Sequence, residues 1–235
     1  MPQKISTEMR DNLEYQLKAV EMLLRIYIQD LRDTDGDPGA MEGLEFFLHA
    51  GIILSVTAWE TYIEDMISDA FTRKLAKATQ PKDLLSTFNS VAKVWLSNQP
   101  KPPDLAMWTS DSWKDVIKEY FRTELMAINT PDRKNIRAIS TKYLDFDLVE
   151  RWSGGNETTL NAGQKLDELI TLRGSLVHNP VKFYKESGDL NEQDVEDAIA
   201  LINVLSEYTD EALQPEPVET IPIFFPPYLS SDESL

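Results

Sequence analysis

An arginine and a histidine stand five positions apart in the segment LRGSLVHNP, which covers residues 172–180. The histidine, His178, is one of 2 in the sequence, and an imidazole can accept or donate a proton near neutral pH. The arginine, Arg173, carries a guanidinium that can hold phosphate oxygens through two parallel hydrogen bonds. The pair could therefore serve proton transfer beside a phosphate group. The alternative is that both side chains only terminate and solvate the end of a helix.

The spacing limits how one chain could use this pair. On an ideal helix, five residues turn through about 500°, so the two side chains point about 140° apart. They converge only if the helix frays before Pro180, which disfavours helical geometry at Asn179. A second copy of the chain could supply the partner equally well. We expect the other histidine, His49, to be structural, because it lies in the apolar helical context LEFFLHAGI.

Glu60 is a carboxylate that could support Arg173. It shares a helical stripe with apolar residues, namely Ile53, Val56, Ile63 and Ile67. This pattern predicts a position at the edge of the core, where a carboxylate needs a partner. Arg173 is a candidate for that partner, and Glu60 would then orient the guanidinium. A solvated carboxylate on the helix flank is the alternative.

Helices must position these residues, because apolar residues recur at three- and four-residue steps and strand-like alternation is scarce. We expect helices over about 8–32, 41–78, 84–96, 113–125, 131–144 and 159–178, and from 192 onward. The expected N-caps are Ser110 or Asp111, then Thr130 with Pro131 at the first helical position, then Asn191 with Asp194 in a capping box. The second helix has the stripe of a central bundle helix: Leu48, Ile52, Ser55, Trp59, Ile63, Met66 and Ala70.

The predicted fold class is therefore all-α: an up-and-down helical bundle with extra helices and an extended, Pro-rich C-terminal arm. We expect one helical domain over residues 1–213 and the arm over residues 214–235. The arm contains the segment IPIFFPPYL, residues 221–229, which is too apolar for a solvated tail. We expect this segment to lie extended in a groove, either on its own subunit or on a partner.

Composition narrows the function classes. The sequence has no cysteine, which excludes disulfides, thiolate metal sites and cysteine nucleophiles. It has no run of 18 apolar residues and no secretory-signal layout at its start, so we expect a cytoplasmic protein without a membrane span. The net charge of −17 argues against nucleic acid as a partner. However, residues 186–235 hold 13 acidic residues and no Lys or Arg, so residues 1–185 are nearly neutral.

The order of these motifs resembles the HEPN superfamily, and within it most closely the RiboL-PSP-type HEPN proteins. The resemblance covers roughly residues 44–212. It rests on the AWETYIED segment at residues 58–65, the helix beginning at Thr130–Pro131, and the Arg-x4-His motif of Arg173 and His178. One position departs from the family pattern, because Gly174 stands where the family usually has Asn, Asp or His.

The resemblance implies a metal-independent endoribonuclease without a cofactor, typically a homodimer in which both motifs line one cleft. It also implies a HEPN-like bundle and a role as a toxin or phage-defence effector, with an antitoxin or defence-system partner. Arg173 and His178 would be catalytic and Glu60 supporting. Asn179 could contact the phosphate, although we favour a helix cap. Lys182, Tyr184 and Lys185 could bind the RNA backbone or stack on a base, or form an ordinary loop.

Two other interpretations stay open. The first is a non-catalytic HEPN module that dimerises and binds a nucleotide or a partner protein, which Gly174 and the acidic C-terminal third favour. The second is that the acidic region occupies the basic cleft as an RNA mimic. A smaller basic cluster, Arg133, Lys134 and Arg137, is more typical of a solvated helix face than of a binding patch.

Overall fold

The computed structural model describes residues 3–33, 38–98, 108, 112–128, 130–152, 157–178 and 190–214. Within these ranges the regular structure is entirely helical, which confirms the predicted all-α class. The elements are α1 (Gln3–Asp33), α2 (Pro38–Lys77), the 3-10 helix η1 (Pro81–Leu84), α3 (Leu85–Asn98), α4 (Trp113–Met126), α5 (Arg133–Leu144), α6 (Leu148–Arg151), α7 (Glu157–His178) and α9 (Glu192–Leu213).

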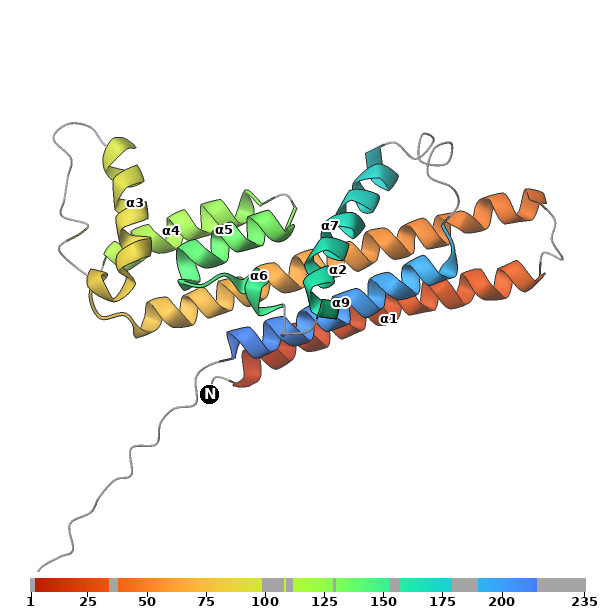
Figure 1. The fold of residues 1–235 in the computed structure, drawn as a ribbon, viewed down its shortest axis with the longest axis horizontal. Coiled ribbons are helices and arrows are strands. Elements are labelled where there is room, and N and C mark those ends of the chain that lie inside the picture. The colour runs from red at the N-terminus through yellow and green to blue at the C-terminus, as the bar shows by residue number, and fades with distance from the viewer. Residues whose placement is uncertain are drawn as a thin grey trace, which may run out of the picture.

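Three long helices form the body of the molecule. α1 and α2 make an antiparallel hairpin, and α9 lies alongside both of them (Figure 1). The predicted stripe of α1 faces this contact, since Leu13, Leu17, Val20 and Leu24 are all buried. On α9, the predicted inward residues Val195, Ala198, Ile202 and Leu205 are likewise buried. Burial of these stripes supplies the main driving force for assembling the three helices.

α2 is the central helix, as its apolar stripe predicts. The stripe residues from Leu48 to Met66 are buried, and Ala70 packs against the core from a partly buried position. Among the described residues, the stretch Leu44–Lys77 is long and apolar enough to cross a membrane by length and composition alone. However, 56% of its most apolar window is buried inside the bundle, which is typical of a core helix.

α3 packs on α4 and α5, and these two helices cover the second half of α2 (Figure 1). Three aromatic rings join these helices: Phe71 of α2 lies 4.2 Å from Phe121 of α4 and 5.1 Å from Tyr143 of α5, between ring centroids. Such tilted and edge-on contacts are favourable arrangements for aromatic pairs. This aromatic cluster fixes α5 on α2, and α5 in turn supports α7.

Two of the predicted helix starts are wrong. α5 begins at Arg133, not at Pro131, because the carboxylate of Asp132 caps it by accepting a hydrogen bond from the Asn135 amide at 2.8 Å. A carboxylate at a helix N-terminus also interacts favourably with the helix dipole, which gives Asp132 an advantage over Thr130. The N-cap of α4 is Ser112 rather than Ser110 or Asp111, and it makes no side-chain capping bond.

The predicted start of α9 is confirmed, since Asn191 and Asp194 form the capping box. The short helix α6 was not predicted. It is capped by Asp147, whose side chain accepts from the Val149 amide at 2.9 Å. The predicted arm beyond Gln214 lies outside the described residues, so the division into domain and arm stays a prediction.

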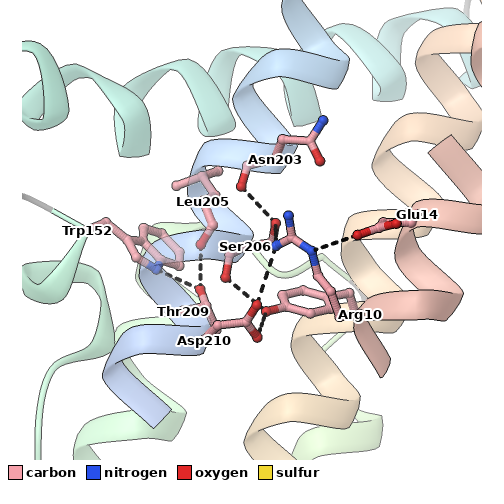
Figure 2. Close-up of polar contacts among 9 residues, drawn as sticks. Arg10, Glu14, Trp152, Asn203, Leu205, Ser206, Thr209 and Asp210 are labelled. Atoms are coloured by element: carbon pink, nitrogen blue, oxygen red, sulfur yellow. Dashed lines mark hydrogen bonds and ion pairs between the residues drawn. The ribbon is translucent and has the colours of Figure 1, made fainter. Parts of the chain in front are cut away.

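A polar network ties the first and last helices together. Figure 2 shows Arg10 of α1 reaching Ser206 and Asp210 of α9, and Arg10 also pairs with Glu14. The hydroxyl of Tyr62 on α2 donates to Asp210 at 2.7 Å. Burial raises the pKa of Tyr62, with the neighbouring Asp210 as the next cause, so this phenol stays a donor. The network fixes the register of α1, α2 and α9.

Candidate functional site

The Arg-x4-His motif lies on the last two turns of α7, a helix that crosses α2 (Figure 1). Arg173 Nη2 donates to Glu60 Oε2 of α2 at 3.3 Å. The two side chains are largely covered, with 27% of Arg173 and 17% of Glu60 exposed. Glu60 therefore lies at the edge of the core, as its stripe predicts. It contacts the guanidinium of Arg173, the partner that the sequence suggested.

The Arg173–Glu60 pair has hydrogen-bonding capacity beyond this contact. Arg173 Nε and Glu60 Oε1 are both buried and have no hydrogen-bond partner among the described residues. Buried polar atoms are rarely left without partners, and such exceptions often occur at functional sites.

Carboxylates dominate the charge on this part of α2. Burial raises the pKa of Glu60, and the nearby Arg173 lowers it without cancelling the effect of burial. Burial also raises the pKa of Glu64, one turn further on, and the charges of Glu60 and Asp65 raise it further. Burial raises the pKa of Asp65 as well. Arg173 is thus the cation at the edge of an acidic cluster formed by Glu60, Glu64 and Asp65.

Two further contacts hold the crossing of α7 in place. The indole of Trp59 donates to the carbonyl of Pro131 at 3.5 Å, which joins α2 to the segment before α5. Arg133 of α5 pairs with Asp167 of α7, at 2.6 Å from Nε to Oδ2 and 3.1 Å from the backbone N to Oδ1. Together with Arg173 and Glu60, these contacts link α2, α5 and α7 in a ring.

Sequence reasoning missed Asp167. The basic cluster lies on a solvent-exposed helix face, as expected, and there Arg133 pairs with Asp167 and Arg137 with Asp147. Asp167 lies six residues before Arg173 on the same helix. The sequence does place an acidic residue on α7 and basic residues at the start of α5. Such charges are too common to identify which two residues pair.

His178 lies on the regular part of α7. α7 stays α-helical to His178, and this side chain is exposed. Five helical residues therefore separate the two side chains by about 140° around the helix axis. Fraying between His178 and Pro180, the condition under which one chain could bring the pair together, lies outside the described residues and stays a prediction. His49, by contrast, is buried, and burial lowers its pKa while Glu45 raises it.

Gly174 borders open space. A β-carbon added at this position meets no heavy atom within 4 Å, so a larger side chain beside Arg173 would fit. At Gly163, one β-carbon would lie 2.6 Å from Arg133 Cδ, because α7 passes close to that side chain. Gly174 is therefore not required by packing, whereas Gly163 is.

Four predicted site residues, Asn179, Lys182, Tyr184 and Lys185, lie outside the described residues. Among the described residues, no three His, Asp or Glu side chains are grouped so that they could hold a metal ion.

The structure is thus an all-α bundle with Arg-x4-His at the end of a late helix and a carboxylate on the central helix facing the arginine. The family model RiboL-PSP-HEPN matches residues 12–214. The chain belongs to the RiboL-PSP-HEPN family. The match begins within α1, so the family domain extends further toward the N-terminus than the expected 44–212. No curated protein and no solved structure matches the chain. HEPN domains are often ribonucleases, and they commonly bind RNA and dimerise.

Proposed function

We propose that this protein is a metal-independent endoribonuclease whose cleft is shared by two copies of the chain. The observation that carries the proposal is the arrangement on α7: Arg173 is held by Glu60, while His178 is exposed at the helix end. An accessible imidazole can transfer protons and a fixed guanidinium can stabilise charge on phosphate, and cleavage through the ribose 2′-hydroxyl uses both kinds of group.

In this proposal His178 acts as the base that removes the proton of the 2′-hydroxyl. The 2′-oxygen then attacks the phosphorus, a 2′,3′-cyclic phosphate forms, and the bond to the 5′-oxygen breaks. The leaving 5′-oxygen takes a proton from a second imidazole. Arg173 stabilises the charge on the phosphate oxygens, and its contact with Glu60 fixes the direction of the guanidinium.

The second imidazole comes from the other copy of the chain. One chain offers a single exposed histidine at this site, because His49 is buried in the bundle. The helical geometry of α7 also turns His178 away from Arg173 of the same chain. A dimer with both α7 ends in one cleft supplies two imidazoles and two guanidiniums. Lys182, Tyr184 and Lys185 would contact RNA beyond the cleft, and Asn179 would cap α7.

The experiment that tests this proposal is cleavage of total RNA by the purified protein in EDTA, beside Arg173→Ala and His178→Ala. We expect cleavage by the wild type, products ending in 2′,3′-cyclic phosphate, and losses of about a hundredfold or more in both variants. Lys93→Ala, an exposed change on α3, is the matched control. Equal cleavage by all four proteins would indicate a contaminating nuclease and contradict the proposal.

A second candidate function is a non-catalytic HEPN module that dimerises and binds a nucleotide or a partner protein. Two observations favour it: the acidic cluster of Glu60, Glu64 and Asp65 beside Arg173, and Gly174 in place of the usual polar residue. In either case we expect a cytoplasmic protein, and a toxin or phage-defence role with an antitoxin or defence-system partner. A folded, dimeric wild type that leaves RNA intact would favour this second function.

A further inference from the structure

A long groove runs along the face of α9 that α1 and α2 leave uncovered. Its larger part, between α7 and α9, has a volume of about 590 Å³ and is lined mainly by apolar side chains, among them Leu169, Leu172, Ala198, Leu201 and Tyr208. Val204, in the same lining, is 39% exposed. An uncovered apolar hollow of this size is typical of a binding groove.

A smaller hollow of about 500 Å³ continues the groove toward the C-terminal end of α9. It lies between α6 and α9 and includes Phe146, Arg151 and Glu211. Tyr208 lines both hollows, so they are neighbours along one helix. Arg151 stands over the ring of Phe146, with its Cζ 5.8 Å from the ring centroid, and it brings a positive charge to this end of the groove. We call the two hollows together the α9 groove.

We propose that residues 215–229 of the same chain fold back along the α9 groove, with residues 221–229 covering its apolar part. The groove approaches the end of α9 at Leu213, which is where this segment begins. Going along the chain from α9, the segment therefore reaches the smaller hollow first and the apolar hollow second. A tethered segment has an effective concentration in the millimolar range, which favours this occupant over one from solution.

The order of chemistry along the segment matches the order along the groove. Residues 215–220 contain Glu216 and Glu219, whose carboxylates would lie near the guanidinium of Arg151. Residues 221–229, IPIFFPPYL, carry no charge, so they suit the apolar hollow and meet no repulsion from the carboxylates that also line it, Glu168, Asp194 and Asp197. The acidic residues Asp232 and Glu233 follow beyond the groove.

The segment is also long enough to span both hollows. From Gln214 back to Tyr208, α9 covers about 9 Å at 1.5 Å per residue, and six extended residues span about 19 Å. From Tyr208 to Asp194 the helix covers about 21 Å, and nine extended residues span about 28 Å. The 5 prolines within residues 215–229 have no N–H, so an extended backbone over apolar side chains leaves few donors unpaired.

Disulfide trapping in the full-length chain tests this proposal, because the natural sequence has no cysteine. Val204→Cys is combined with Phe225→Cys, and the control combines Glu207→Cys with Phe225→Cys. Glu207 is exposed on α9 and nearer to the tether, but it lies outside the groove. We expect the Val204 pair to form its intrachain disulfide about tenfold faster or more, as read by mass spectrometry of peptides.

Three further arms make the result decisive. Ile223→Cys and Tyr228→Cys replace Phe225→Cys in turn, so that a shifted register is still detected. Arg151→Glu should slow trapping, and Glu216→Arg together with Glu219→Arg in that background should restore it. Equal rates for the Val204 and Glu207 pairs in every register would overturn the proposal. A disulfide that forms mainly between two chains would also overturn it, by assigning the groove to the segment of a second copy. Neither readout depends on ribonuclease activity.

Discussion

Arg173 of α7 and Glu60 of α2 are in contact at 3.3 Å although 113 positions separate them in the sequence. The central helix thereby sets the direction of the guanidinium. Glu60→Ala should leave Arg173 without this partner and lower RNA cleavage by about tenfold to a hundredfold, because small displacements of a positioned group are costly. Glu60→Gln retains the shape and an acceptor, so its loss should be smaller. Initial rates on a short RNA oligonucleotide measure both, and equal losses would speak against orientation as the role of Glu60.

Mixing the wild type with His178→Ala tests whether the cleft is shared. The two proteins are refolded together so that mixed dimers form, and each mixed dimer has a single His178. Because the proposed reaction uses His178 of both chains, a mixed dimer should be inactive, and an equal mixture should have about a quarter of the wild-type activity at the same total protein concentration. About half of the wild-type activity would show that each chain works with its own histidine, which would contradict the shared cleft.

The acidic cluster beside Arg173 should make stability depend on pH. The pKa of Glu64 lies above its ordinary value of 4.5 in the folded protein, because of burial and the charges of Glu60 and Asp65. The folded state thus holds this proton more tightly, so stability falls as pH rises from about 4.5 through the raised pKa.

Glu64→Gln should therefore raise the urea midpoint at pH 7 and leave it unchanged near pH 4, where the wild-type carboxyl is protonated in both states. The exposed change Glu119→Gln on α4 serves as the control. A gain of the same size at both pH values would show that ionisation of Glu64 is not the cause.

Two glycines of α7 should respond oppositely to the same change. Gly174→Ala meets no atom within 4 Å, so it should stabilise the protein by about 1 kcal/mol through helix propensity. Gly163→Ala brings its β-carbon to 2.6 Å from Arg133 Cδ, so it should disturb the pair with Asp167 and destabilise. Thermal unfolding of both variants measures the difference, and a stabilising Gly163→Ala would contradict the close packing of α7 on Arg133.

Gly174→Asn restores the type of side chain that the family usually has beside the arginine. The open space at Gly174 accommodates it, so the fold should be retained. If the protein is a ribonuclease, we expect faster cleavage by this variant, measured at equal dimer concentration. If the folded Gly174→Asn variant does not cleave RNA, the result would favour the binding module.

The sequence predicts helices and their buried faces well here, because an apolar stripe at three- and four-residue steps leaves few alternatives. The stripe through Ile53 and Val56 put Glu60 at the edge of the core, and the structure has it there. Helix starts are harder, since Thr130 and Asp132 are both good caps two residues apart. The charge of Asp132 at the helix N-terminus and the packed environment of the buried Pro131, whose carbonyl accepts from Trp59, together favour the later start.

Long-range polar pairs were mostly beyond sequence reasoning. Many acidic residues could have faced Arg133, and the choice of Asp167 depends on how α7 crosses α5. That crossing follows from the whole core, not from residues near either partner. Helix geometry alone left two alternatives for His178: a frayed helix end within one chain, or a partner from a second copy. The structure shows that α7 is regular as far as His178.

The contact of Arg10 with Ser206 and Asp210 also constrains when the protein can fold. The partners are 196 and 200 positions apart, so α1 is synthesised long before α9 exists. At about 5–20 residues per second, the interval on the ribosome is roughly 10–40 s. During that time the α1–α2 hairpin exposes the apolar faces that α9 later covers. A nascent chain therefore passes through an aggregation-prone stage, and the Arg173–Glu60 contact is supported by a closed bundle only after α9 has been made.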